Sequence, residues 1–241
     1  MVKYLIAFIN ICKGVQSSAF INLPHQPHAG MKAMNYLDAL NWRYAVKEFS
    51  NQTLSQTQID GLVESVRLSA SAYGMQPYKL LIVESAALKN ACIPFSYGQN
   101  KVAECSHLLV LANYTEIPAD AINTYIRELA VSQGKEAEAL SAYKDIISQD
   151  ILSRTSAEQK IWAEQQCYIA LGKLLSYAAM HQIDAGPMTG FDTQGINQVL
   201  GLDKQGLNAA ILCPVGIRSK NDTIATRPKF RKTTEQLVIT L

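Results

Sequence analysis

Charged side chains are scarce in this sequence. Asp, Glu, Lys and Arg make up only 17% of the 241 residues, below the roughly 25% of an average soluble domain. Hydrophobic residues make up 48%, so much of the surface is expected to be buried, in a core or in an oligomer. The length suits one large domain or two small ones. The net charge is only +2, which excludes bulk nucleic-acid binding by a polycationic chain.

Cysteine and histidine are also few, and their spacings do not match metal sites. The five cysteines include no Cys-x-x-Cys pair, and the four histidines form no His-Glu-x-x-His pattern. We therefore expect no metal site. An odd number of cysteines without framework spacing favours a reducing compartment, so we expect a cytoplasmic protein. Glycine-rich phosphate-binding loops are absent too, so any bound phosphate must be held by side chains.

The N-terminal stretch differs from the rest of the chain. Residues 4–12 are apolar but too short to span a bilayer, and with the small polar residues that follow they resemble a weak signal peptide. Residues 22–30 are rich in Pro and His and read as a linker. We expect residues 1–33 to be a non-essential extension or a mis-set start, residues 34–241 to form the functional domain, and no membrane to be a partner.

Helical and extended segments alternate from Asn35 onward. Apolar spacing predicts helices over residues 36–40, capped by Asn35, and over residues 55–70. Strands are predicted over residues 78–83, 107–112 and 209–215. The last two are apolar without alternation, which indicates strands covered on both faces.

Two further helical regions follow the second predicted strand. Residues 117–149 are polar and helical, with a break near Gly134. A capping box from Ser156 to Gln159 predicts the start of a helix that ends near His181. Apolar residues cover most faces of this helix, which predicts a place in the core or in an oligomer interface.

Two groups of cations interrupt this weakly charged chain. Arg43 and Lys47 stand four residues apart among apolar neighbours, and half-buried cations usually need an anion. Six cations lie between positions 218 and 232, opposed by one carboxylate. Among them, Lys229 and Arg231 share one side of an extended chain, a pair that suits a phosphate. Charge alone does not establish a phosphate site. The stretch with Arg43 and Lys47 can also be a solvated helix-to-strand junction, and residues 218–232 can also be a solvated tail or a tail that binds nucleic acid.

Four short motifs follow one another along the chain. They are Arg43-Tyr44-Ala45-Val46-Lys47-Glu48-Phe49, Ser69-Ala70-Ser71-Ala72-Tyr73-Gly74-Met75-Gln76-Pro77-Tyr78, Pro187-Met188-Thr189-Gly190-Phe191-Asp192, and Pro214-Val215-Gly216 with Arg227-Pro228-Lys229-Phe230-Arg231. Each is weak alone, but in this order and spacing the chain resembles the FMN-dependent nitroreductase family, of the oxygen-insensitive NAD(P)H type, over residues 35–241. The resemblance implies an α+β nitroreductase-like fold: a central mixed, mostly antiparallel sheet flanked by helices, in an intertwined homodimer.

The resemblance also implies which residues bind FMN. The phosphate would be held by Arg43, Lys229 and Arg231, and the pyrimidine edge of the flavin by Lys47 and Lys101. Tyr44, Ala45 and Gln99 would line the cofactor, and Thr189 and Gly190 would offer backbone N–H groups to N5 and O4. Ser71 and Met75 would reach FMN from the partner subunit.

The implied activity is hydride transfer from NADH or NADPH through FMN to nitroaromatic, quinone or related small-molecule acceptors, by a ping-pong mechanism. We expect no catalytic side chain beyond electrostatic support from Lys47. The chain departs from the family at three positions, where Ala45 replaces Ser, Gly74 replaces Asn and Thr189 replaces Glu. These changes leave open a flavin-binding or flavin-storage protein with little turnover. Residues 117–149, which cover the substrate in the family, match poorly and do not indicate the acceptor.

Overall fold

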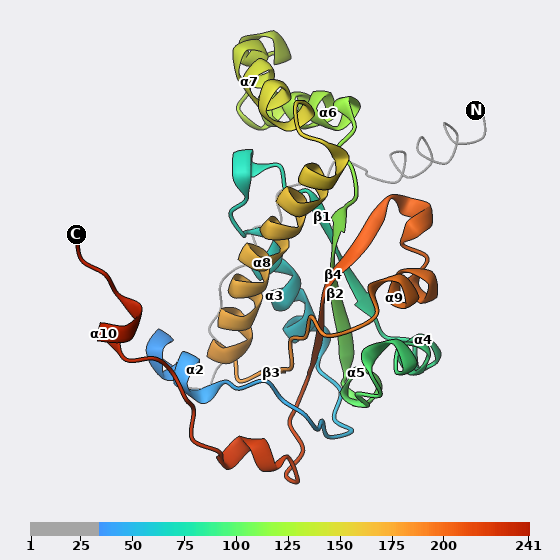
Figure 1. Ribbon diagram of the computed structural model, residues 1–241, viewed down its shortest axis with the longest axis vertical. Coiled ribbons are helices and arrows are strands. Elements are labelled where there is room, and N and C mark those ends of the chain that lie inside the picture. Colours follow the sequence, from blue (N-terminus) through green and yellow to red (C-terminus); the bar gives the residue numbers. More distant parts are fainter. Residues whose placement is uncertain (1–33) are drawn as a thin grey trace. The chain divides into compact units, whose positions relative to one another are not determined.

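An antiparallel sheet of four strands, in the order β1-β2-β4-β3, forms the centre of the protein (Figure 1). The computed structural model describes residues 34–241, so our expectations for residues 1–33 lie outside the described residues. The strands are β1 (Tyr78–Val83), β2 (His107–Tyr114), β3 (Asp184–Ala185) and β4 (Leu207–Gly216). A parallel bridge joins Ala45 to Ala185. The predicted strands and the mostly antiparallel pairing are confirmed.

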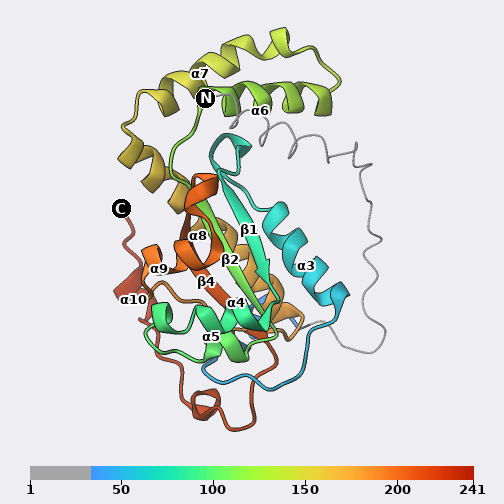
Figure 2. The same ribbon diagram turned by 90° about the vertical axis from the view of Figure 1, so that its right-hand side faces the viewer.

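Helices cover both faces of this sheet. The helices of the described chain are α2 (Tyr36–Trp42), α3 (Gln56–Arg67), α4 (Ala86–Ala91), α5 (Lys101–Glu104), α6 (Ala119–Ser132), α7 (Ser141–Leu152), α8 (Ser156–Met180), α9 (Thr193–Leu200) and α10 (Thr234–Leu237). Figures 1 and 2 show α3 and α8 on one face and α4, α5 and α9 on the other. The predicted α+β class is confirmed. No helix in the described part of the chain is both long and apolar enough to cross a membrane.

The central strand β2 shows why its sequence lacks alternation. Leu109 and Leu111 belong to the core that α3 and α8 close, whereas Leu108 and Val110 belong to the core on the opposite face. All four side chains are at most 1% exposed. An apolar residue is therefore required at every position, as we expected for a strand covered on both faces.

The capping box of α8 lies one residue before the predicted one. Thr155 is the N-cap, and its box partner is Glu158, whose Oε2 accepts from the Thr155 backbone N–H at 2.8 Å. Our choice of Ser156 and Gln159 was wrong because the Gln159 side chain is buried, where its Oε1 accepts from the Ile117 N–H at 2.8 Å. Both registers match the box pattern, and only burial separates them.

A pair of helices, α6 and α7, extends beyond one end of the sheet (Figure 2). It has a small core of its own, with Ile122, Ile126, Ile147 and Ile151 fully or almost fully buried against Trp162 of α8. The predicted break near Gly134 is confirmed, since α6 ends just before this residue and its φ is +63°.

Candidate functional site

The segment that carries Arg43 and Lys47 passes very close to the end of β3. The Val46 N–H donates to the Ala185 carbonyl at 3.2 Å. A Cβ at the next residue, Gly186, would lie 2.6 Å from the Val46 carbonyl oxygen. Glycine is therefore required at position 186, and this close approach places Lys47 beside Lys101 of α5.

We expect Gly186→Ala to destabilise the protein by about 1–3 kcal/mol, the usual cost of overpacking a filled site. The obstacle is backbone, which cannot rotate away as a side chain can. Urea unfolding of the variant and the unmodified protein measures the change. An unchanged midpoint would contradict the close approach of the two segments.

A buried carboxylate, Asp222, fixes the backbone of the same segment. Its Oδ2 accepts from the Lys47 N–H at 2.8 Å, the Glu48 N–H at 3.3 Å and the Tyr44 hydroxyl at 3.0 Å. Partial burial opposes ionisation, but these donors and the Ile224 N–H outweigh it and hold the pKa of Asp222 below its usual range. From the sequence we expected Asp222 only to oppose the charge of the C-terminal cations, and we did not expect it to bind the backbone at Lys47. The signal that could have indicated this role is that Asp222 is the single carboxylate among those six cations.

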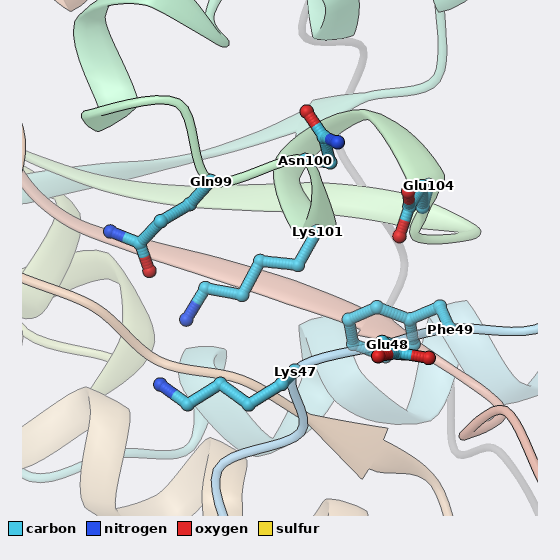
Figure 3. Close-up of a pocket in the computed structure, with 7 residues that line it drawn as sticks. All are labelled: Lys47, Glu48, Phe49, Gln99, Asn100, Lys101 and Glu104. Atoms are coloured by element: carbon cyan, nitrogen blue, oxygen red, sulfur yellow. The ribbon is translucent and has the colours of Figure 1, made fainter. Parts of the chain in front are cut away.

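The amines of two lysines point into one pocket. The pocket has a volume of about 500 Å³ and is lined by Lys47, Glu48, Phe49, Gln99, Asn100, Lys101 and Glu104. Figure 3 shows the side chains of Lys47, Lys101 and Gln99 converging on one region. The two lysines come from segments more than fifty residues apart, and the sheet brings them together.

Lys101 is a buried cation that has no carboxylate partner in the described part of the chain. Its side chain belongs to a residue only 3% exposed, and its Nζ donates to the Gly186 carbonyl at 3.3 Å. Burial, and then the charge of Lys47, lower the pKa of Lys101 to about 8. Neither lysine takes part in an ion pair within residues 34–241. Such a pair is suited to an anionic ligand.

A second group of cations consists of Arg43, Lys229 and Arg231. Burial and Arg231 lower the pKa of Arg43, and burial followed by the two arginines lowers the pKa of Lys229. The three side chains are therefore neighbours, and none pairs with a carboxylate of the described chain. Burial raises the pKa of the Cys213 thiol to about 12, and Lys101 and Arg43 both act against this rise. Lys101 and Arg43, one from each cation group, therefore both lie near Cys213 of β4.

Two of the six C-terminal cations have structural partners. Lys229 donates to the carbonyls of Leu40, at 2.7 Å, and Asn41, at 2.8 Å, so it caps the C-terminal end of α2. Arg218 was counted with the basic tail, but it pairs with buried Asp184. Its Nε donates to Asp184 Oδ1 at 2.7 Å, and its Nη2 lies 2.6 Å from the same oxygen without the alignment of a hydrogen bond.

Two exposed backbone amides follow β3. Among residues 34–241, the N–H groups of Thr189 and Gly190 have no acceptor. The turn is held in place by Met188, which exchanges two backbone hydrogen bonds with Leu212 of β4. Tyr97 lies beside it, with Cε2 at 4.0 Å from the position of a Cβ at Gly190. These amides can donate to acceptor atoms of a bound ring.

Ser71 and Met75 lie at the other end of the sheet. They flank the 3-10 turn η1 (Ala72–Gly74), which leads into Tyr78 at the start of β1 (Figure 1). Tyr78 pairs with Asn113, whereas Lys101 precedes His107 at the opposite end of β2. The six residues of β1 separate the two ends by roughly 20 Å. A single chain therefore does not bring this loop to the lysine pocket.

The described chain is an α+β protein with a pocket into which two lysine amines point. The model of the nitroreductase family matches residues 40–217, so the chain belongs to this family, as its motifs predicted.

Known proteins of this kind match most of the chain. The major NAD(P)H-flavin oxidoreductase of Aliivibrio fischeri is 26% identical over 210 residues, which cover 83% of this chain and 95% of that protein. The crystal structure of ydfN from Bacillus subtilis has a TM-score of 0.76 at 19% identity, covering 86% of this chain and 98% of that one. A protein from Exiguobacterium sibiricum, crystallised in complex with FMN, has a TM-score of 0.74 at 18% identity, covering 88% of this chain and 99% of that one.

Proposed function

We propose that this protein is an FMN-dependent oxidoreductase that takes electrons from NADH or NADPH. The observation that carries the proposal is the set of unpaired cations in two groups, with two free amides nearby. This donor set fits FMN, which carries a phosphate at one end and hydrogen-bond acceptors on its ring. The relative from Aliivibrio fischeri, named for NAD(P)H and flavin, supports the same conclusion. When bound, FMN would supply the hydride chemistry.

Each group of side chains has a distinct role in this proposal. Arg43 and Arg231 bind the phosphate, since both lack a carboxylate partner among residues 34–241 and Arg offers a planar fork of donors. Lys229 adds charge nearby while it caps α2. Lys47 and Lys101 stabilise negative charge on the pyrimidine edge of the ring. The backbone around Tyr44 and Ala45, with Gln99, shapes the pocket.

The amides of Thr189 and Gly190 complete the set by donating to N5 and O4. Their N–H groups are exposed and have no acceptor among residues 34–241. The replacement of Glu by Thr at position 189 leaves these backbone donors in place, so the departure from the family motif does not remove the contact.

The functional unit in this proposal is a homodimer. Ser71 and Met75 lie too far from Lys47 within one chain, so the partner must supply them. The helix α8 offers a surface for association, because Ile161, Tyr168 and Ile169 are 44–56% exposed on it. At Gly172 of the same helix, a Cβ would meet nothing within 4 Å in this chain, which leaves room for a partner's backbone.

The acceptor is a small nitroaromatic, quinone or related molecule, and turnover is ping-pong. The reasoning is steric: one pocket beside the ring admits the nicotinamide and the acceptor in turn. We place the protein in the cytoplasm, where the four described cysteines stay reduced. Cys92, Cys105, Cys167 and Cys213 are all free and buried, which suits core packing in a reducing compartment.

The visible spectrum of the purified protein tests the proposal. We expect a yellow protein, or a colourless one that takes up added FMN, and rapid bleaching of the flavin by NADH or NADPH without oxygen. Reoxidation by a quinone completes the cycle, and parallel double-reciprocal lines identify the ping-pong order. Bound flavin that is not bleached would identify a flavin-storage protein. No flavin uptake at all would overturn the assignment.

A further inference from the structure

The loop that carries Ser71 and Met75 has an unusual backbone. Tyr73 has φ +57°, Gly74 φ +76° and Gln76 φ +45°. Only one of these three residues is a glycine, and a bulky side chain in the left-handed region costs about 1–2 kcal/mol. Such a conformation persists only where the surroundings impose it.

Two tyrosines from outside the loop hold its strained residue. The Tyr125 hydroxyl of α6 donates to the Tyr73 carbonyl at 2.5 Å, and the Tyr143 hydroxyl of α7 donates to the same oxygen at 3.3 Å. Tyr143 also meets the Tyr73 ring edge to face, with ring centroids 6.4 Å apart. We call Tyr73, Tyr125 and Tyr143 the tyrosine cluster. Both donors act on the peptide next to the left-handed residue.

A third contact fixes the side chain of Tyr73. Its hydroxyl donates to Asp150 Oδ2 at 2.9 Å, and Asp150 also accepts two hydrogen bonds from Arg154. On the other side of the loop, the Gln166 side chain accepts from the Ala72 N–H at 2.8 Å. The loop is therefore held between the α6–α7 pair and α8.

We propose that Tyr125 and Tyr143 are positioning residues for the flavin. By holding the left-handed turn at Tyr73, they direct Ser71 and Met75 toward the FMN bound mainly by the partner subunit. This inference rests on the proposed function. It gives the α6–α7 pair a role in flavin binding, because any change in the packing of these helices alters a loop that contacts the cofactor. The three residues of the tyrosine cluster lie far apart in the sequence, and no motif there predicts that they meet.

The test is the double variant Tyr125→Phe/Tyr143→Phe, which keeps both rings and removes both hydroxyls. We expect the Kd of FMN to rise about 5- to 30-fold, from two lost hydrogen bonds, with the protein still folded by circular dichroism. Riboflavin should weaken by the same factor, because the loop does not serve the phosphate. Tyr114→Phe is the matched control, since Tyr114 packs against the same small core and its hydroxyl makes no hydrogen bond within residues 34–241, and it should leave both affinities unchanged.

The circular dichroism of the bound flavin separates positioning from a general loss of stability. It should change in the double variant and stay unchanged in Tyr114→Phe. Unchanged FMN affinity in the folded double variant would overturn the inference. A wild-type protein that binds no FMN would instead overturn the proposed function.

Discussion

Arg231→Ala is expected to raise the Kd of FMN about 10- to 150-fold while leaving the Kd of riboflavin unchanged. Arg231 has no carboxylate partner in the described chain, and its charge acts on Arg43 and Lys229. A charge-assisted hydrogen bond to a phosphate contributes about 1.5–3 kcal/mol, which gives this factor in affinity. Fluorescence titration of the apoprotein with the two flavins measures the difference, because riboflavin lacks the phosphate.

Lys229→Met gives the contrasting result. Lys229 uses its amine on the carbonyls at the end of α2, so its loss should lower the urea midpoint as well as FMN affinity. Arg231→Ala should leave the midpoint nearly unchanged, since its side chain is exposed and, within residues 34–241, donates only to the adjacent Phe230 carbonyl. Equal losses of FMN and riboflavin affinity in Arg231→Ala would mean that Arg231 serves the fold and not the phosphate.

The reduction potential of the FMN-loaded protein should fall more steeply above about pH 8 than below it. Burial and Lys47 lower the pKa of Lys101 to about 8, so below this pH the amine is charged in both redox states. Above it, the amine is neutral until reduction places negative charge beside it, which raises its pKa and draws in a proton. One extra proton for two electrons adds about 30 mV per pH unit to the slope. Dye-equilibrated titrations between pH 6 and 9.5 measure it.

Two variants test the assignment to Lys101. Lys101→Met should abolish the change of slope. Lys47→Met should move it to higher pH, because the second cause of the lowered pKa is removed. A break that persists in Lys101→Met would belong to another group and would exclude this lysine from the redox site.

The pH dependence of the stability of the apoprotein tests the lowered pKa of Lys101 independently of the flavin. Lys101 has an ordinary pKa of 10.5 when unfolded and about 8 when folded, so between these values the unfolded chain binds more protons. Stability from this residue therefore rises with pH across that window and is flat below pH 8. Urea unfolding of the apoprotein and of Lys101→Met should diverge in this sense.

Much of the fold was readable from the sequence because its signals are local. The apolar runs at 107–112 and 209–215 predicted strands with both faces covered, and Gly134 predicted the break between α6 and α7. The start of α8 was misplaced by one residue because Thr155 and Ser156 both begin a capping-box pattern. The burial of Gln159, a tertiary property, decided between them.

The motifs alone determined the family and the candidate cofactor residues, because each motif is contiguous and their order is fixed along the chain. Only the tertiary structure decided how the cations are used. It pairs Arg218 with Asp184, turns Lys229 toward the end of α2 and leaves Arg43 and Arg231 without a carboxylate partner among residues 34–241. It also buries Lys101 beside Lys47, through a close approach that Gly186 permits. Charge is a property of a residue type, but whether a charge is paired, buried or free depends on neighbours that lie far away in the sequence.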